Sequence, residues 1–83
     1  MKVYIVIMEQ NNETTEIVAV HRTRKHAETA LATLKSMQFM LTEGWAFEQG
    51  SEVKHDSAGL YEVVDPMSER ALCIRIEEVE LKN

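Results

Sequence analysis

Residues 23–41, with the sequence TRKHAETALATLKSMQFML, decide the fold of this chain. The segment contains no Gly or Pro, and its Ala, Leu and Lys residues favour a helix. Its apolar residues recur at intervals of three and four, which places them on one side of a helix. They are Ala27, Ala30, Leu31, Leu34, Met37 and Leu41. Thr23 can cap the first turn, and Gly44 can end the helix. The sequence therefore predicts one amphipathic helix that needs an apolar surface to lie on.

Four segments around this helix have the short, β-branched and alternating pattern of strands. They are residues 2–8, 15–21, 60–65 and 71–81. The turn between the first two contains Asn11 and Asn12, which tolerate positive φ. In the last segment Val79 and Leu81 have the opposite parity from the preceding apolar residues. We therefore expect a one-residue bulge near Glu77-Glu78.

The order strand, strand, helix, strand, strand predicts an α+β fold with a four-stranded, largely antiparallel sheet and one helix across one face. Residues 1–83 are short enough to form a single domain. Residues 44–59 have mixed polarity and three glycines. We expect this segment to be a loop or a hairpin insertion.

One helix covers only one face of such a sheet, so the other face is open in a monomer. Alternation along the strands assigns six residues to this open face: Tyr4, Val6, Met8, Ile17, Ala19 and Cys73. Because an apolar patch of that size is usually a contact surface, the sequence predicts a homodimer. Tyr4, Val6, Met8 and Ile17 form the expected dimer interface.

The charge of the chain is acidic and uneven. The formal net charge is −5. Residues 1–42 carry five basic and four acidic side chains, whereas residues 43–83 carry four basic and ten acidic ones. The acidic half disfavours nucleic acid and suits a partner with a basic surface.

No segment predicts export or membrane insertion. The apolar run at 3–8 is too short for a signal peptide, and no run approaches the ~20 apolar residues that span a bilayer. The single Cys73 leaves no internal disulfide, which suits a reducing compartment. We expect a cytoplasmic protein of a bacterial host, for the reason that follows.

Several segments resemble a group of small uncharacterised proteins of bacteria and their phages. The segments are KVYIVIM, IVAVH, HAETAL and IRIEEVEL. The group combines an N-terminal VYxV hairpin with a capped helix and a C-terminal IEEVEL strand. The resemblance covers about half of the chain and does not include 44–59. It implies, by analogy with small phage proteins, a chain that binds and blocks a host factor.

The titratable residues do not form a recognisable catalytic or metal-binding pattern. The three histidines lack Cys or acidic partners at metal-ligand spacing, and Cys73 has no neighbouring base. We therefore expect no catalytic residues, no metal and no cofactor. The basic cluster Arg22, Arg24 and Lys25 at the helix start leaves open whether an anion binds there.

Two groups of residues are candidates for partner contact. Phe39 and Met40 leave the apolar stripe of the helix, and Trp45 and Phe47 follow closely. Aromatic and Met side chains are enriched in interface cores. Glu77, Glu78 and Glu80 give the last strand an acidic surface, which serves either to discourage aggregation or to attract a basic partner.

The sequence thus predicts a non-enzymatic protein-binding module, a phage-encoded inhibitor or modulator of a host protein, such as a defence protein. Two alternatives remain open. One is a structural or regulatory homo-oligomer without a host target. The other is a small-ligand sensor that uses the open sheet face.

Overall fold

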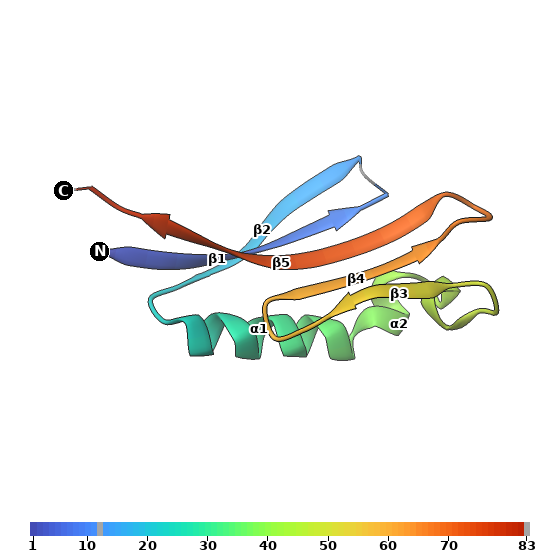
Figure 1. Cartoon of the computed structure of the whole chain (residues 1–83), viewed down its shortest axis with the longest axis horizontal. Helices are drawn as coiled ribbons and strands as arrows, with labels where there is room; N and C mark the ends of the chain where they lie inside the picture. Colours follow the sequence, from blue (N-terminus) through green and yellow to red (C-terminus); the bar gives the residue numbers. More distant parts are fainter. Residues whose placement is uncertain (12, 83) are drawn as a thin grey trace.

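The computed structural model describes residues 1–11 and 13–82. The strands are β1 (Lys2–Gln10), β2 (Thr14–His21), β3 (Glu52–Asp56), β4 (Leu60–Asp65) and β5 (Arg70–Glu80). The helical elements are α1 (Arg24–Ser36), α2 (Gln38–Leu41) and the single 3-10 turn η1 (Trp45–Phe47). Neighbouring strands are all antiparallel, in the order β2-β1-β5-β4-β3. The main helix α1 lies across one face of the sheet, which confirms the expected α+β fold (Figure 1).

The sheet has five strands and not the expected four. The additional strand β3 comes from the segment 44–59 and pairs with β4 as a hairpin. All five residues of β3 are exposed, and four of them are polar or charged. A short edge strand of this kind buries no apolar face, so its sequence carries no alternating pattern.

The predicted helix begins where expected but ends early. The Thr23 hydroxyl accepts a hydrogen bond from the His26 backbone N–H at 3.2 Å, as an N-cap does. Helix α1 ends at Ser36, because Met37 leaves helical geometry with φ −96° and ψ 10°. The chain continues as the short α2 and then turns at Gly44, which has φ +88°. In the hairpin between β1 and β2, Asn11 has the expected positive φ, and Asn12 lies outside the described residues.

The assignment of sheet faces was wrong for β1. Val6 and Met8 are buried in the core beneath α1, and Tyr4 packs against the same cluster. Both faces of β1 are apolar, so alternation alone could not orient it. The pairing with β5 decides which face of β1 is buried, because Val6 lies opposite Ile76 and Met8 opposite Ile74. Tyr4, Val6 and Met8 therefore cannot form the open-face interface, and Val6→Glu would unfold the chain.

Two further placements follow from the same register. Ala19 pairs with Val6 and also packs against the core, whereas Ile17 pairs with Ile7 on the open face, as expected. The bulge expected near Glu77-Glu78 is absent, since β5 pairs with β1 without a shift over the described Lys2–Gln10. Val79 instead lies opposite Val3.

The core lies between α1 and the centre of the sheet. Its largest fully buried side chains come from α1, β1, β4 and β5 and are Leu31, Val6, Val63, Leu72 and Ile74. Tyr61 is also buried, and its hydroxyl donates to the Gln38 side chain. The core is a single layer one helix wide, and the molecule is elongated, with extents of 47 × 22 × 19 Å. Each core side chain therefore carries a large share of the stability.

Leu31→Ala should lower the free energy of unfolding by about 2–5 kcal/mol, the usual range for a large-to-small change in a core. The exposed fraction of Leu31 is 2%, whereas Leu34 is only half-buried. Leu34→Ala is therefore the matched control and should cost less. Urea unfolding monitored by circular dichroism measures both. Equal midpoints for the two variants would contradict this packing.

Candidate functional site

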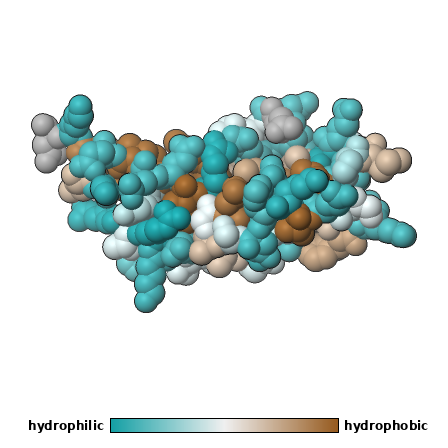
Figure 2. Space-filling view, viewed as in Figure 1, coloured by the Kyte–Doolittle hydropathy of each residue, from teal (hydrophilic) through white to brown (hydrophobic). Residues whose placement is uncertain are grey.

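An aromatic patch stands out on the surface formed by α2 and η1. We define it as Phe39, Met40 and Phe47, whose exposed fractions are 66%, 69% and 61%. The rings of Phe39 and Phe47 contact each other, with centroids 5.8 Å apart and planes tilted by 42°. Figure 2 shows hydrophobic surface over this end of the molecule, bordered by hydrophilic atoms. Three large apolar side chains that remain exposed together are typical of a contact surface.

Trp45 does not belong to this patch, although the sequence predicted it there. Its exposed fraction is 6%, and it packs in the core with Leu72 and Tyr61. The Arg70 guanidinium lies over the indole, 5.5 Å from the ring centroid. Trp45 thus anchors η1 to the sheet, because its large apolar surface is better buried than exposed. It positions Phe47, two residues later, without itself being available to a partner.

Hydrogen bonds hold the backbone beneath the patch. The buried Thr42 hydroxyl donates to the Gln38 carbonyl at 2.7 Å, and the Ala46 N–H donates to the same hydroxyl at 3.4 Å. The Gly44 N–H donates to the Phe39 carbonyl at 2.9 Å. A Cβ at position 44 would lie 3.2 Å from the Phe39 ring. Gly44 therefore supplies both the left-handed turn and the space in which Phe39 lies.

The turn between β4 and β5 holds Arg70, whose guanidinium lies over the Trp45 ring. Asp65 accepts hydrogen bonds from the Ser68 hydroxyl at 2.6 Å, from the Met67 N–H at 3.2 Å and from Arg70 at 2.9 Å. These bonds favour the carboxylate form, so the Ser68 and Arg70 contacts hold the pKa of Asp65 below its ordinary value. Asp65 thereby holds Arg70 over the Trp45 ring.

A cavity of about 240 Å³ lies beside the patch, at the end of the sheet. It is lined by Gln10, Asn11, Leu41, Thr42, Glu43, Trp45, Arg70, Ala71 and Leu72. Several of its polar groups already have partners within the chain. The Gln10 amide donates to the Leu41 carbonyl, the Asn11 side chain accepts from the Ala71 N–H, and Arg70 binds Asp65. These three groups are therefore not free to recognise a small molecule.

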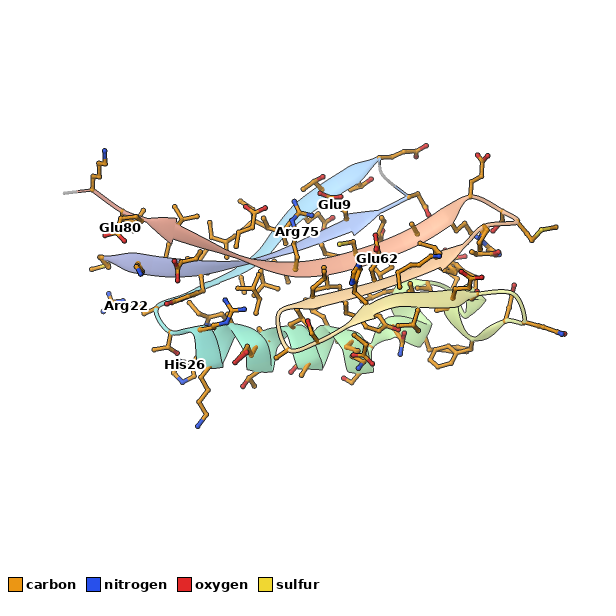
Figure 3. The ribbon with its side chains drawn as sticks, viewed as in Figure 1. Glu9, Arg22, His26, Glu62, Arg75 and Glu80 are labelled. Atoms are coloured by element: carbon orange, nitrogen blue, oxygen red, sulfur yellow. The ribbon has the colours of Figure 1, made fainter. Side chains whose placement is uncertain are left out.

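The open face of the sheet is partly polar and not the apolar surface that the sequence suggested. Arg75 projects from this face and binds Glu9 at 2.6 Å and Glu77 at 3.0 Å (Figure 3). Cys73 lies beside them, and burial raises the pKa of its thiol. A protonated thiol is a poor nucleophile, which argues against covalent chemistry at this position. Apolar residues of this face come from β1, β2 and the end of β5, and also from β4, where Leu60 and Val64 alternate with the buried Tyr61 and Val63.

The acidic residues of β5 are not next to the aromatic patch. Glu80 lies at the end of the molecule opposite to α2 (Figures 1 and 3). Each acid has a partner within the chain: Glu77 binds Arg75, Glu78 lies 3.7 Å from Lys2, and Glu80 lies 3.2 Å from the N-terminal amine. The two groups of residues predicted for partner contact thus form separate surfaces.

Basic side chains and two histidines lie close together at the start of α1. The His21 and His26 rings lie 6.3 Å apart, and Arg24 lies 3.9 Å from Glu28. Arg22 and His26 both lie at this corner (Figure 3). Whether the cluster Arg22, Arg24 and Lys25 binds an anion stays an open prediction.

Comparisons with known proteins add no relative to this picture. No family model, curated protein or solved structure matches the chain. The resemblance to small bacterial and phage proteins therefore stays a prediction. Within the described residues, no three His, Cys, Asp or Glu side chains converge as metal ligands would. Across the same residues, no helix is long and apolar enough to cross a membrane.

Asp65→Asn should weaken the dependence of stability on acid pH. Because the folded-state pKa of Asp65 is lowered, its stabilisation is fully present above the ordinary value of 3.8 and is lost as pH falls through the folded-state pKa. The variant should be less stable than the parent chain at pH 7, with a difference that shrinks toward pH 2. Thermal melts across this range measure it, and a difference independent of pH would contradict the assignment.

Gly44→Ala should disturb the aromatic patch, whereas Gly50→Ala should not. Both glycines have positive φ, so each change costs about 1–2 kcal/mol in backbone energy. A Cβ at position 50 meets nothing within 4 Å, whereas one at position 44 meets Phe39. Nuclear Overhauser contacts between the Phe39 and Phe47 rings should be lost only in Gly44→Ala. Retention of these contacts in that variant would show that the glycine does not make room for Phe39.

Proposed function

We propose that this chain is a non-enzymatic protein-binding module and that its partner contacts the aromatic patch. The observation that carries the proposal is the packing of two exposed Phe rings against each other on a hydrogen-bonded backbone. The Phe39 and Phe47 rings contact each other, and both side chains still leave most of their surface exposed to solvent. A partner that covered them would bury rigid aromatic side chains at little cost in conformational entropy.

The arrangement beneath the patch supports recognition by a preformed surface. Trp45 packs η1 against the sheet, and the Thr42 hydroxyl joins α2 to η1. A surface held in this way loses less freedom on binding than a flexible loop does. Phe47 also lies in the segment 44–59 that the resemblance does not include, and Phe39 and Met40 lie just before it, where a shared scaffold would acquire its own target.

The charged groups favour binding over catalysis. Two of the buried or half-buried titratable side chains, Asp65 and Arg75, are satisfied by ion pairs within the chain. A catalytic site needs such groups to converge on a space that a substrate can enter. The acids Glu77, Glu78 and Glu80 belong to β5, and Glu80 lies at the end of the molecule opposite to α2 (Figure 3). We therefore assign them long-range attraction of a basic partner and not direct contact.

That the partner is a host protein rests on the resemblance, and that its surface is basic rests on the acidic charge of residues 43–83. By analogy with small phage proteins, we propose a host protein with a basic surface, such as a defence protein, that this chain inhibits or modulates. The chain would then act in the bacterial cytoplasm.

Replacing both Phe39 and Phe47 by Ala should abolish capture of a protein partner from bacterial lysate while the fold survives. Both side chains are largely exposed, so the melting temperature should change little. Met67→Ala is the matched control, since Met67 is an exposed apolar side chain on the turn between β4 and β5. Once the partner is purified, calorimetry should show a loss of about 2 kcal/mol or more for the aromatic double variant.

The acidic surface is tested separately with the same partner. Reversing Glu77, Glu78 and Glu80 to Lys should slow association chiefly at low salt, where charges are least screened.

Two outcomes would contradict the proposed site. The first is a Phe39→Ala and Phe47→Ala double variant that binds the partner as the parent chain does. If the aromatic double variant and Met67→Ala both lose binding, a general loss of surface apolarity would explain the result, and the proposed site would be overturned as well.

A further inference from the structure

The two edges of the sheet are unlike each other. The edge strand β3 has the sequence EVKHD, is five residues long and carries charges along most of its length. Charges of this kind on an edge prevent pairing with another chain. The other edge strand, β2, is eight residues long, and its central part is Ile17, Val18, Ala19 and Val20. Only the β3 edge is protected.

The unprotected edge is open to solvent. Among the described strands, β2 pairs only with β1, so the outer row of its backbone N–H and C=O groups lacks a strand partner. The exposed fractions of Ile17 and Val20 are 66% and 57%, and Val18 is also exposed. An exposed edge with β-branched side chains is a template for adding a strand.

Charge along β2 favours a second copy of the same strand in the antiparallel direction. Glu13 and Glu16 lie at its beginning, whereas His21, Arg22 and Arg24 lie at or just after its end. In an antiparallel pair the acidic end of one copy meets the basic end of the other. A parallel pair would bring like charges together.

A bulge in β2 fixes the register of this pairing. Ile17 lies opposite Ile7 and Val20 opposite Ile5, and the pairing shifts by one residue between them. Ile17 and Val20 therefore share the open face although they are three residues apart. A two-fold axis between Val18 and Ala19 places Ile17 of one copy opposite Val20 of the other.

The same axis also brings residues of the two copies opposite each other on the face that α1 covers. It places Glu16 of one copy opposite His21 of the other. These residues pair with Met8 and Tyr4 within the chain, so both project toward the side that α1 covers. Each opposed pair thus lies on one face, as an antiparallel ladder requires. Without the bulge, residues three apart would project to opposite faces.

We propose that two copies of this chain pair β2 against β2 in this register. Five strands from each copy then form one continuous ten-stranded antiparallel sheet. The contact joins Ile17 to Val20 on the open face and Glu16 to His21 on the other. This inference does not depend on the proposed partner site, because the aromatic patch belongs to α2 and η1 and stays exposed in the pair.

Sedimentation or light scattering over a range of concentrations tests the assembly. An edge contact is small, so the chain should change from monomer to dimer between about 10 and 500 µM. Replacing both Ile17 and Val20 by Lys should keep the chain monomeric over this range. Val53→Lys is the matched control, an exposed Val on the protected edge strand β3, and should dimerise as the parent chain does. A parent chain that stays monomeric throughout would overturn the proposal.

Disulfide trapping tests the register. In a Cys73→Ser background, a mixture of Ile17→Cys and Val20→Cys chains should form a linked dimer on oxidation, because the two positions are opposed. Either variant alone should link at least tenfold more slowly, since its own two thiols would lie roughly 10 Å apart along the strands. A face-to-face dimer, or another strand register, would remove the preference of the mixture and would overturn the pairing. Melting curves of each variant establish that it is folded.

Discussion

The antiparallel ladder between β1 and β5 is the constraint on which the rest of this structure depends. It joins Lys2–Gln10 to Leu72–Glu80 without a shift, so the two ends of the chain form the centre of the sheet. This pairing sets which side of β1 meets α1, because the clearly amphipathic β5 carries Ile74 and Ile76 on one side and Arg75 on the other. Its contacts are distant in sequence, so the chain must close a long loop before the core can form.

The same arrangement leaves a small protein with distinct surfaces. Helix α1 covers the middle of one face, and the other face carries the ion pairs of Arg75 between apolar residues of β1, β2 and β4. The aromatic patch lies beyond the end of α1, where the chain turns at Gly44. The β2 strand forms the edge of the sheet opposite to β3. A single layer of core therefore carries two surfaces that lie apart from each other.

Much of the fold could be predicted because it rests on local patterns. The Thr23 cap, the apolar stripe through Ala27 and Leu31, and four of the strands follow from spacing and propensity. The fifth strand was missed because β3 buries nothing. Trp45 was misplaced because an isolated aromatic residue in a polar segment has the same sequence signal whether it anchors a turn or awaits a partner. The exposure of Phe39 and Met40 agrees with their position outside the stripe.

The sequence by itself determined the α+β class and the start of the helix. Only the tertiary structure decided which face of β1 is buried, because a strand that is apolar on both sides takes its orientation from its neighbours. It also decided that Ile17 and Val20 share a face, since the bulge that aligns them exists only in the pairing with β1. Local spacing encodes what a segment becomes, whereas register is a property of two segments together.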